Sequence, residues 1–267
     1  MMDYQPKIWQ DALNNYQEIA PDIRLCSHIQ SYWFSYKDSS SPPSRVIPDL
    51  CSDLIIRLSL EFDILQIDIC GPSTHFFYST SRQPTIYFGI RFYLGGMYAL
   101  LDQSFKGLKD QLLDLAIFEK GIATDLVKHL SGNDSFVGLT KSADRYFLER
   151  LNRSTIKSIS KPIQLFFAGN QRSSNYTEII AKSTLSERSL QRLFREETGL
   201  SPYEVFDVLR FQKVYQELSS HPTIKQLDLV DKYGFFDQSH YSRKLKRMTG
   251  LSPQAIQQHV GILQDKC

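Results

Sequence analysis

The sequence predicts an α+β protein, with an antiparallel β-barrel or sandwich followed by a helical annex and then an all-α domain of two helix-turn-helix units. Three observations predict this. Short aromatic or β-branched segments, separated by turn residues, fill about residues 23–92. Apolar residues then recur at helical spacing. The pentapeptide Thr-Gly-Leu-Ser-Pro occurs at Thr198–Pro202 and again at Thr249–Pro253. We expect domains spanning 1–158 and 159–267.

The amino-terminal region is predicted to form six short strands. They are separated by Ser, Pro, Asp and Gly, the residues that favour turns. Short strands at this spacing favour an antiparallel barrel or sandwich. The predicted strands are His28–Tyr36, Arg45–Ile47, Asp53–Leu60, Ile64–Cys70, His75–Ser79 and Thr85–Phe92.

From Met97 to about Ser158 the apolar spacing predicts helices. The first is indicated by the apolar set Leu108, Leu112, Leu115 and Phe118. The second is indicated by Ile122, Leu126 and Leu130. A third is expected over Ser142–Ile156, and Ser158–Pro162 has the composition of a linker.

Each copy of the pentapeptide has the chemistry of a junction between two helices. Glycine ends a helix in the left-handed conformation, and Ser followed by Pro suits the N-cap and first position of the next helix. The copies lie 51 residues apart. This distance fits one small helical unit for each junction and is too short for two domains with large cores of their own.

Two helix-turn-helix units are therefore predicted. In the first, a helix over Tyr176–Lys182 precedes a turn and a second helix from the cap Ser186 to Thr198. In the second, a helix over Lys225–Lys232 precedes a turn and a helix from the cap Asp237 to Met248. The inward stripes are predicted to be Leu190, Leu193 and Phe194, and then Tyr241, Leu245 and Met248.

The outward faces of the two second helices carry the candidate DNA-binding residues. Arginine can bond guanine, glutamine can bond adenine, and Ser, Lys and helix N-termini can hold phosphates. For each single residue, the alternative is that it lies on a solvated helix face and contacts no DNA. The candidates are Ser186, Glu187, Arg188, Gln191, Arg192, Arg195, Gln238, Ser239, His240, Arg243, Lys244 and Arg247.

Charge is divided unevenly along the chain. From Lys157 onward there are 16 Lys and Arg against 11 Asp and Glu, although the whole chain carries a net charge of only +2. A positive surplus on a small helical region suits a polyanion partner. The four cysteines are scattered, and no apolar run approaches the roughly 20 residues that cross a bilayer. We therefore expect no membrane partner and a cytoplasmic location.

The carboxy-terminal motifs closely resemble AraC/XylS-type transcription regulators. The resemblance rests on Arg188–Pro202, on the pattern Gly-Phe-x-Asp-Gln-Ser-His-aromatic-Ser-Arg within Tyr233–Arg247, and on Thr249–Pro253. It covers about Lys161–Val260 and implies a sequence-specific regulator that binds double-stranded DNA in successive major grooves of one face. It also implies RNA polymerase as a partner if the protein is an activator. Where such proteins usually have alanine in each first helix, this chain has Ile180 and Val230.

The amino-terminal region resembles, more weakly, the sensory domain attached to one bacterial subgroup of these regulators. The similar segments are Tyr32–Phe34, Ile47–Ile55, Gly71-Pro72 and Gly89–Gly96. The resemblance implies a cupin-like barrel that senses a small-molecule effector or mediates homodimer formation. Where the subgroup has Arg-Pro before Gly-Gly, this chain has Tyr93-Leu94. Candidate effector contacts are Trp33, Arg57, Tyr87 and Arg91, which could equally be core aromatics and arginines in surface or buried ion pairs.

No catalytic residue, metal ligand or cofactor is predicted. The chain lacks phosphate-binding loops and nucleophile elbows, and its six histidines show no metal-binding spacing. Asp49 and Asp53 are expected to bond the backbone near a turn. Two alternatives stay open: a barrel enzyme or ligand-binding protein whose helical tail serves assembly, and an interaction regulator that no longer binds DNA. The histidines are His28, His75, His129, His221, His240 and His259.

Overall fold

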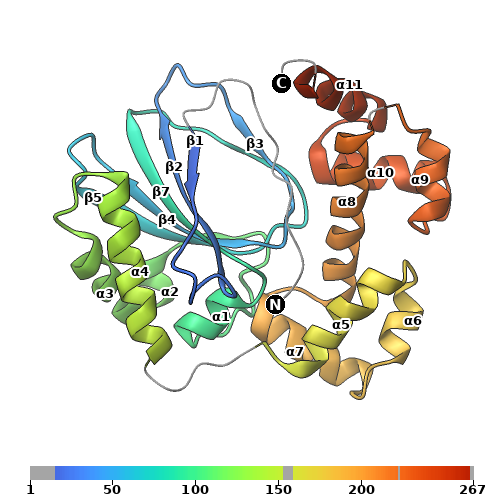
Figure 1. Ribbon diagram of the computed structural model, residues 1–267, viewed down its shortest axis with the longest axis horizontal. Helices are drawn as coiled ribbons and strands as arrows, with labels where there is room; N and C mark the ends of the chain where they lie inside the picture. The colour runs from blue at the N-terminus through green and yellow to red at the C-terminus, as the bar shows by residue number, and fades with distance from the viewer. Residues whose placement is uncertain (1–15, 153–158, 222, 265–267) are drawn as a thin grey trace.

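The computed structural model describes residues 16–152, 159–221 and 223–264, and Figure 1 shows a sheet on one side and a helical domain on the other. The main sheet is antiparallel with the strand order β1-β2-β7-β4-β5-β8, and β3 and β6 form a separate pair. The strands are β1 (Tyr16–Ile19), β2 (Ile29–Lys37), β3 (Ser44–Val46), β4 (Ser52–Leu58), β5 (Ile64–Cys70), β6 (Phe77–Ser79), β7 (Thr85–Phe92) and β8 (Leu112–Asp114).

All six predicted strands are confirmed: two have the predicted ends, and the ends of the others shift by at most two residues. The expected barrel is not closed, because β1 and β8 are the two edges of an open sheet. These edge strands are also the ones that the sequence did not indicate. Each is short and, among the described residues, pairs with a single neighbour, β1 with β2 and β8 with β5.

The two faces of the main sheet differ in chemistry because side chains alternate along each strand. One face carries buried apolar side chains that include Tyr32, Leu54, Phe88 and Ile90. In Figure 1 helices α3 and α4 cover one face of this sheet, and their buried side chains belong to the same apolar cluster. The other face carries Trp33, Asp53, Arg57, Tyr87 and Arg91, as the cross-strand register requires.

The helical annex contains α1 (Gly96–Leu101), α2 (Leu115–Phe118), α3 (Lys120–Leu130) and α4 (Phe136–Asn152). The helix expected over Leu108, Leu112, Leu115 and Phe118 is wrong, because β8 and the four-residue α2 occupy this stretch. Left-handed residues at Asp102 and Asp110 break helical continuity there. The expected Ile122, Leu126 and Leu130 stripe is buried on α3, and residues 153–156 of the third expected helix lie outside the described residues.

The carboxy-terminal domain is all-α, as predicted. Figure 1 shows α8 as a long connector, with α5 to α7 packed at one end and α9 to α11 at the other. The helices are α5 (Lys161–Arg172), α6 (Tyr176–Ala181), α7 (Glu187–Thr198), α8 (Pro202–Ser220), α9 (Gln226–Lys232), α10 (Gln238–Thr249) and α11 (Pro253–Gln264).

Two apolar cores stabilise the chain, one centred in each domain. The carboxy-terminal core is not confined to its own domain, because Ile47, Leu50 and Leu94 of the amino-terminal domain are buried within it. None of the helices in the described part of the chain has the length and apolar composition that a membrane span requires.

Candidate nucleic-acid interface

The first helix-turn-helix unit is formed by α6 and α7. Asn175 caps α6 by accepting from the backbone N–H of Thr177 at 2.9 Å. Ser186 caps α7 by accepting from the N–H of Ser189 at 3.3 Å. Phe194 of α7 packs edge-on against Phe166, with ring centroids 5.0 Å apart. These contacts fix the inward face of α7 and confirm the predicted cap and stripe.

The outward face of α7 carries every candidate predicted for the first unit. Arg188, Arg192 and Arg195 are exposed, and Gln191 is half-buried. The amide of Gln191 donates to Glu187 Oε1 at 3.3 Å, one helical turn earlier. Ser186 and Glu187 are also exposed at the amino-terminal end. This end is the part of a recognition helix that normally meets base edges.

The second unit is formed by α9 and α10 and repeats this construction. Asp237 caps α10 by accepting from the N–H of His240 at 2.6 Å. The predicted stripe of Tyr241, Leu245 and Met248 is buried. Gln238, Ser239 and Arg243 are exposed on the outward face. We call α7 and α10 the recognition helices. They lie at opposite ends of α8 (Figure 1), and each exposes Arg and polar side chains on its outward face.

His240 is half-buried and does not lie freely on that face. Its Nδ1 accepts from the backbone N–H of Phe236 at 3.3 Å. Burial lowers the pKa of His240, and the positive charges of Arg210 and Lys244 lower it further. The imidazole is therefore neutral near pH 7, which suits its role as an acceptor.

Lys244 also has a partner within the domain. Its Nζ donates to Asp207 Oδ2 of α8 at 2.5 Å and lies 5.7 Å from the ring centroid of Tyr203. Asp207 is buried and accepts from Arg210 Nη2 at 2.7 Å. Lys244 thus ties α10 to α8, and its assignment to a DNA contact stays a prediction, as do those of the other candidates.

The two Thr-Gly-Leu-Ser-Pro copies form equivalent junctions, with the same glycine conformation and threonine bond. Gly199 and Gly250 both have φ of 77°, in the left-handed region that glycine favours. The hydroxyl of Thr198 donates to the Phe194 carbonyl at 2.6 Å, and that of Thr249 donates to the Leu245 carbonyl at 2.8 Å. The prediction of two equivalent helix-to-helix junctions is confirmed.

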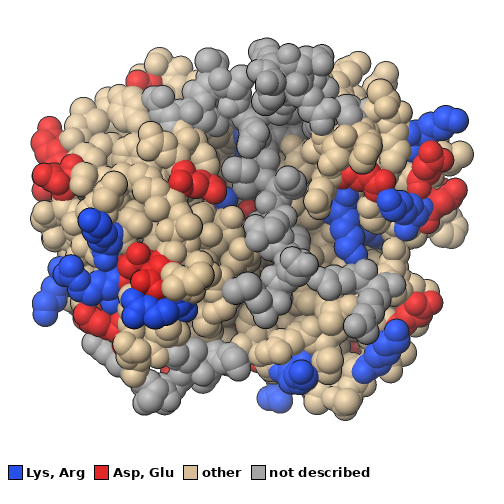
Figure 2. All heavy atoms as spheres, in the orientation of Figure 1, with Lys and Arg blue, Asp and Glu red and all other residues tan. Residues whose placement is uncertain are grey.

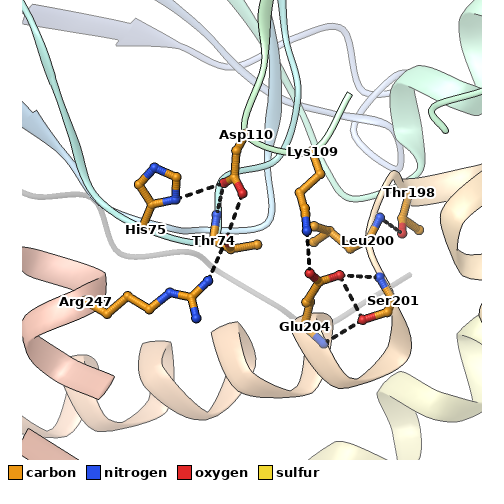
Figure 3. A network of polar contacts seen from close by, with 9 residues as sticks. All are labelled: Thr74, His75, Lys109, Asp110, Thr198, Leu200, Ser201, Glu204 and Arg247. Carbon is orange, nitrogen blue, oxygen red and sulfur yellow. Dashed lines mark hydrogen bonds and ion pairs between the residues drawn. The ribbon is translucent and has the colours of Figure 1, made fainter. Parts of the chain in front are cut away.

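Both junctions also rest on the amino-terminal domain, which the sequence did not indicate. At the first junction, the Phe105 N–H donates to the Glu196 carbonyl at 2.8 Å, and Lys109 Nζ bonds Glu204 Oε1 at 2.9 Å. Figure 3 shows this ion pair beside the capping box that Ser201 and Glu204 form at the start of α8. The sequence shows the repeated pentapeptide. It does not show that Phe105 and Lys109 contact the first copy, because they lie about 90 residues earlier in the chain.

At the second junction, the contacts involve a predicted DNA-binding residue. Arg247 Nη2 donates to Thr74 Oγ1 at 3.4 Å, and the Phe76 N–H donates to the Arg247 carbonyl at 3.3 Å. Thr74 in turn donates from its hydroxyl to Asp110 Oδ2 at 2.9 Å (Figure 3). Arg45 Nη1 donates to the Thr249 carbonyl. Arg247 therefore lies at the domain interface in this arrangement, although it is exposed.

Basic and acidic side chains are mixed on the molecular face that Figure 2 shows. Figure 2 shows Lys and Arg on both halves of the molecule, interspersed with Asp and Glu on the face drawn. Lys and Arg are therefore dispersed on this face and do not form one large patch there. DNA recognition would depend on where individual arginines lie along α7 and α10 more than on one large charged patch.

The four candidate effector contacts lie on one face of the main sheet. Trp33 stands opposite Gly89, and a Cβ on that glycine would lie 1.8 Å from the indole. Arg57 stands opposite Tyr87. The structure thus brings Trp33, Arg57, Tyr87 and Arg91 onto the same surface, the face turned away from the apolar core cluster.

A carboxylate links two of these residues. Trp33 Nε1 donates to Asp53 Oδ1 at 2.7 Å, and Arg91 Nε lies 3.4 Å from the same oxygen. Glu18 lies 3.5 Å from Arg91 Nη1. Burial alone would lower the pKa of Arg91, but the carboxylates of Asp53 and Asp49 raise it well above its ordinary value. The guanidinium is therefore held in its charged form.

Asp49 and Asp53, both expected to bond the backbone, have different partners. Asp49 Oδ1 accepts from the Cys51 N–H at 3.0 Å, which confirms the expected backbone bond, whereas Asp53 bonds Trp33. Burial raises the pKa of Asp49. Within the described residues, no group of three or more His, Cys, Asp or Glu side chains is arranged to hold a metal ion.

Two family models match separate parts of the chain. Residues 180–259 match the family model of a helix-turn-helix domain, and residues 17–114 match that of a domain of unknown function (DUF6597). The HTH-type transcriptional activators RhaS of Escherichia coli strains SE11 and O9:H4 HS are each 31% identical over 84 residues. That match covers 32% of this chain and 30% of each relative, so it spans less than a third of their length.

Among solved structures, ToxT from Vibrio cholerae O395 aligns with a TM-score of 0.42 and 12% identity, covering 85% of this chain and 96% of ToxT. A second ToxT crystal form aligns with a TM-score of 0.38 and 11% identity, covering 92% of this chain and 98% of ToxT. On the family-model and RhaS matches, residues 180–259 form a helix-turn-helix domain of the AraC type, and residues 17–114 are similar to DUF6597.

Proposed function

We propose that this protein is a sequence-specific DNA-binding transcription regulator of the bacterial cytoplasm, without catalytic activity. The observation that carries the proposal is the pair of capped helix-turn-helix units, α6–α7 and α9–α10, at opposite ends of α8. Their exposed Arg, Gln and Ser side chains suit base edges and phosphates. The two recognition helices would enter successive major grooves on one face of DNA, about 34 Å apart.

The direct test is selection of bound fragments from genomic DNA, followed by salt titration of the selected duplex. We expect enrichment of sites with two half-sites one helical turn apart and an affinity that falls as salt rises. Scrambled duplexes of the same composition are the control. Equal affinity for selected and scrambled duplexes at every salt concentration would refute sequence-specific binding.

The relatives matched by the carboxy-terminal region are named transcriptional activators, and we extend this role to the present chain as part of the proposal. RNA polymerase would then be its protein partner, and a homodimer would present four recognition helices instead of two. In vitro transcription from a selected promoter should rise when the protein is added. Reduced transcription would indicate a repressor, and sedimentation on and off DNA would give the number of chains bound.

We further propose that the amino-terminal domain senses a small molecule on the sheet face that carries Trp33, Arg57, Tyr87 and Arg91. Charged and aromatic groups that converge on one face support this, since effector sites combine apolar surface with a few placed polar groups. An effector would act by favouring the DNA-competent arrangement of the two domains. Compounds that change the fluorescence of Trp33 in the wild type but not in an Arg91→Gln variant would identify candidates.

A further inference from the structure

Two adjacent phenylalanines in the turn before α10 have opposite surroundings. Phe235 is only 7% exposed, and its ring packs edge-on against Tyr241 and lies 4.3 Å from the Arg210 guanidinium. Phe236 is 91% exposed, the highest value among the large apolar side chains of the described residues. The fold therefore uses Phe235 as a core residue and leaves the ring of Phe236 in solvent.

A structural role at the helix start does not explain Phe236. The residue before an N-cap often packs against the fourth helical residue and so fixes the direction in which the chain enters the helix. For α10 these positions are Phe236 and Tyr241, with Asp237 as the cap between them. A ring that is 91% exposed does not cover Tyr241, and Phe235 already makes that contact.

The same position is apolar and exposed in the first unit. The 51-residue offset between the repeats aligns Phe236 with Leu185, which precedes the cap Ser186 and is 37% exposed. In both units, an apolar side chain that the domain core does not enclose thus directly precedes the N-cap of the recognition helix. The larger and more exposed of the two belongs to α10.

The surroundings of Phe236 indicate what it would meet. It directly precedes the amino-terminal end of α10, and this end of a recognition helix approaches base edges in the major groove. Exposed Gln238, Ser239 and Arg243 follow on the same helix. The major groove offers one apolar group to a protein, the C5-methyl of thymine, and phenylalanine is among the side chains that contact it.

We propose that Phe236 is a specificity-determining residue that packs against a thymine methyl in the half-site read by α10. This inference rests on the proposed function, since it needs a DNA complex. Burying one methyl-sized group against the ring would strengthen binding about fourfold. Leu185 would make a weaker contact of the same kind in the other half-site, so thymine dependence should be stronger on the α10 side.

The test uses a selected duplex in which each thymine of the α10 half-site is replaced singly by uracil, which lacks only the methyl. For the wild-type chain we expect about fourfold weaker binding at one position. Phe236→Ala should bind the thymine duplex at least fourfold more weakly and should not distinguish uracil from thymine at that position. Its salt dependence should match the wild type, because an apolar contact releases no counterions.

Leu227→Ala is the matched control. Leu227 is 61% exposed on α9, the first helix of the same unit, and its replacement should leave the uracil effect intact. Thermal unfolding checks that neither variant is destabilised. A Phe236→Ala variant that keeps the wild-type ratio for thymine and uracil would overturn the inference, as would the absence of any uracil effect in the wild type. Normal DNA binding with impaired transcription would assign Phe236 to a protein contact and overturn it as well.

The two hypotheses fail in different ways. If the wild-type chain prefers no duplex, the proposed function is refuted before any uracil is introduced. If it binds selectively and the Phe236 dependence is missing, only the methyl contact is refuted.

Discussion

The two helix-turn-helix units share their backbone construction and differ in how their recognition helices are held. Each recognition helix has a side-chain cap at its start and ends at a glycine in the left-handed region, with φ of 77°. The carbonyls of Glu196 and Arg247, at equivalent positions, both accept from the amino-terminal domain. In α10 the side chains of Lys244 and Arg247 are bonded as well, to α8 and to Thr74. The corresponding residues of α7, by the 51-residue offset, are Leu193 and Glu196. The repeat therefore specifies geometry, while the side chains between repeated positions decide which surfaces each helix contacts.

The largest effect is expected from a variant that removes the bond between Lys244 and Asp207, which has no counterpart at Leu193 of the first unit. Asp207→Ala leaves the buried Arg210 and the ammonium of Lys244 without their shared carboxylate, at 2.7 and 2.5 Å in the wild type. We expect a loss of about 3 kcal/mol in the free energy of unfolding, measured by urea denaturation. Lys244→Leu, which copies Leu193, should cost less because Arg210 keeps its partner.

Asp231→Ala removes an exposed carboxylate from α9 and should change the free energy of unfolding by no more than about 0.5 kcal/mol. If Asp207→Ala were as mild as this control, the network between α8 and α10 would not stabilise the second unit.

The second prediction compares the two junction glycines. Alanine at either position is strained in the left-handed region by about 1 to 2 kcal/mol. At Gly250 its Cβ would also lie 2.5 Å from the Phe76 ring and 2.7 Å from Arg45, whereas at Gly199 the nearest atom is the Phe105 carbonyl oxygen at 3.0 Å. We expect Gly250→Ala to lower the thermal unfolding midpoint more than Gly199→Ala does.

Gly132→Ala serves as the reference, since Gly132 has φ of 78° and no atom lies within 4 Å of its Cβ position. The difference between Gly250→Ala and Gly132→Ala isolates the contact with the amino-terminal domain. Identical losses for these two variants would mean that the second junction does not depend on that contact.

The third prediction concerns Arg192 and Arg243, which occupy the same position in the two recognition helices. Replacement of either by alanine should weaken binding to a selected duplex about tenfold, within the range for a single side-chain contact. A base contact would relax preference at one position, and a phosphate contact would weaken all sequences and reduce the salt dependence. Fluorescence anisotropy over a salt series measures both.

Arg24→Ala in the amino-terminal domain removes the same charge from an exposed site and is the control. Unequal losses for Arg192→Ala and Arg243→Ala would show that one unit dominates recognition. Unchanged binding in both variants would contradict the assigned DNA-binding faces.

The smallest expected effect is a pH dependence of the second unit. The lowered pKa of His240 means that the unfolded chain takes up a proton more readily than the folded chain. Stability should therefore fall, by less than about 1 kcal/mol, as the pH decreases through about 6.5. His240→Ser, which copies Ser189, should reduce this decrease in a pH series of urea unfolding curves. The residual decrease would include His28, whose pKa burial also lowers.

Local signals explain which features the sequence could predict. The cap Ser186 and the glycine after Thr198 bound α7 at the residues expected, because cap and stop signals act over a few residues. The edge strand Leu112–Asp114 was missed because it depends on pairing with β5, more than 40 residues earlier. Leu112 also fits a helical stripe with Leu108 and Leu115, and the apolar pattern gives no sign of the left-handed residue at Asp110.

The candidate site shows the same limit. The outward positions of both recognition helices follow from the apolar stripe, which the structure confirms. The partners of Lys244 and Arg247 could not be predicted, because Asp207 lies 37 residues away and Thr74 lies 173 residues away. Such bonds depend on tertiary packing, which periodicity does not encode.

The three apolar side chains that the first domain inserts into the second core have a thermodynamic consequence. Ile47, Leu50 and Leu94 are buried among carboxy-terminal residues. Melting of either domain would expose surface of both, because apolar interfaces couple the unfolding of the parts they join. Heat denaturation should then be one cooperative transition. A carboxy-terminal fragment without the first domain would expose the apolar surface that these side chains cover in the whole chain.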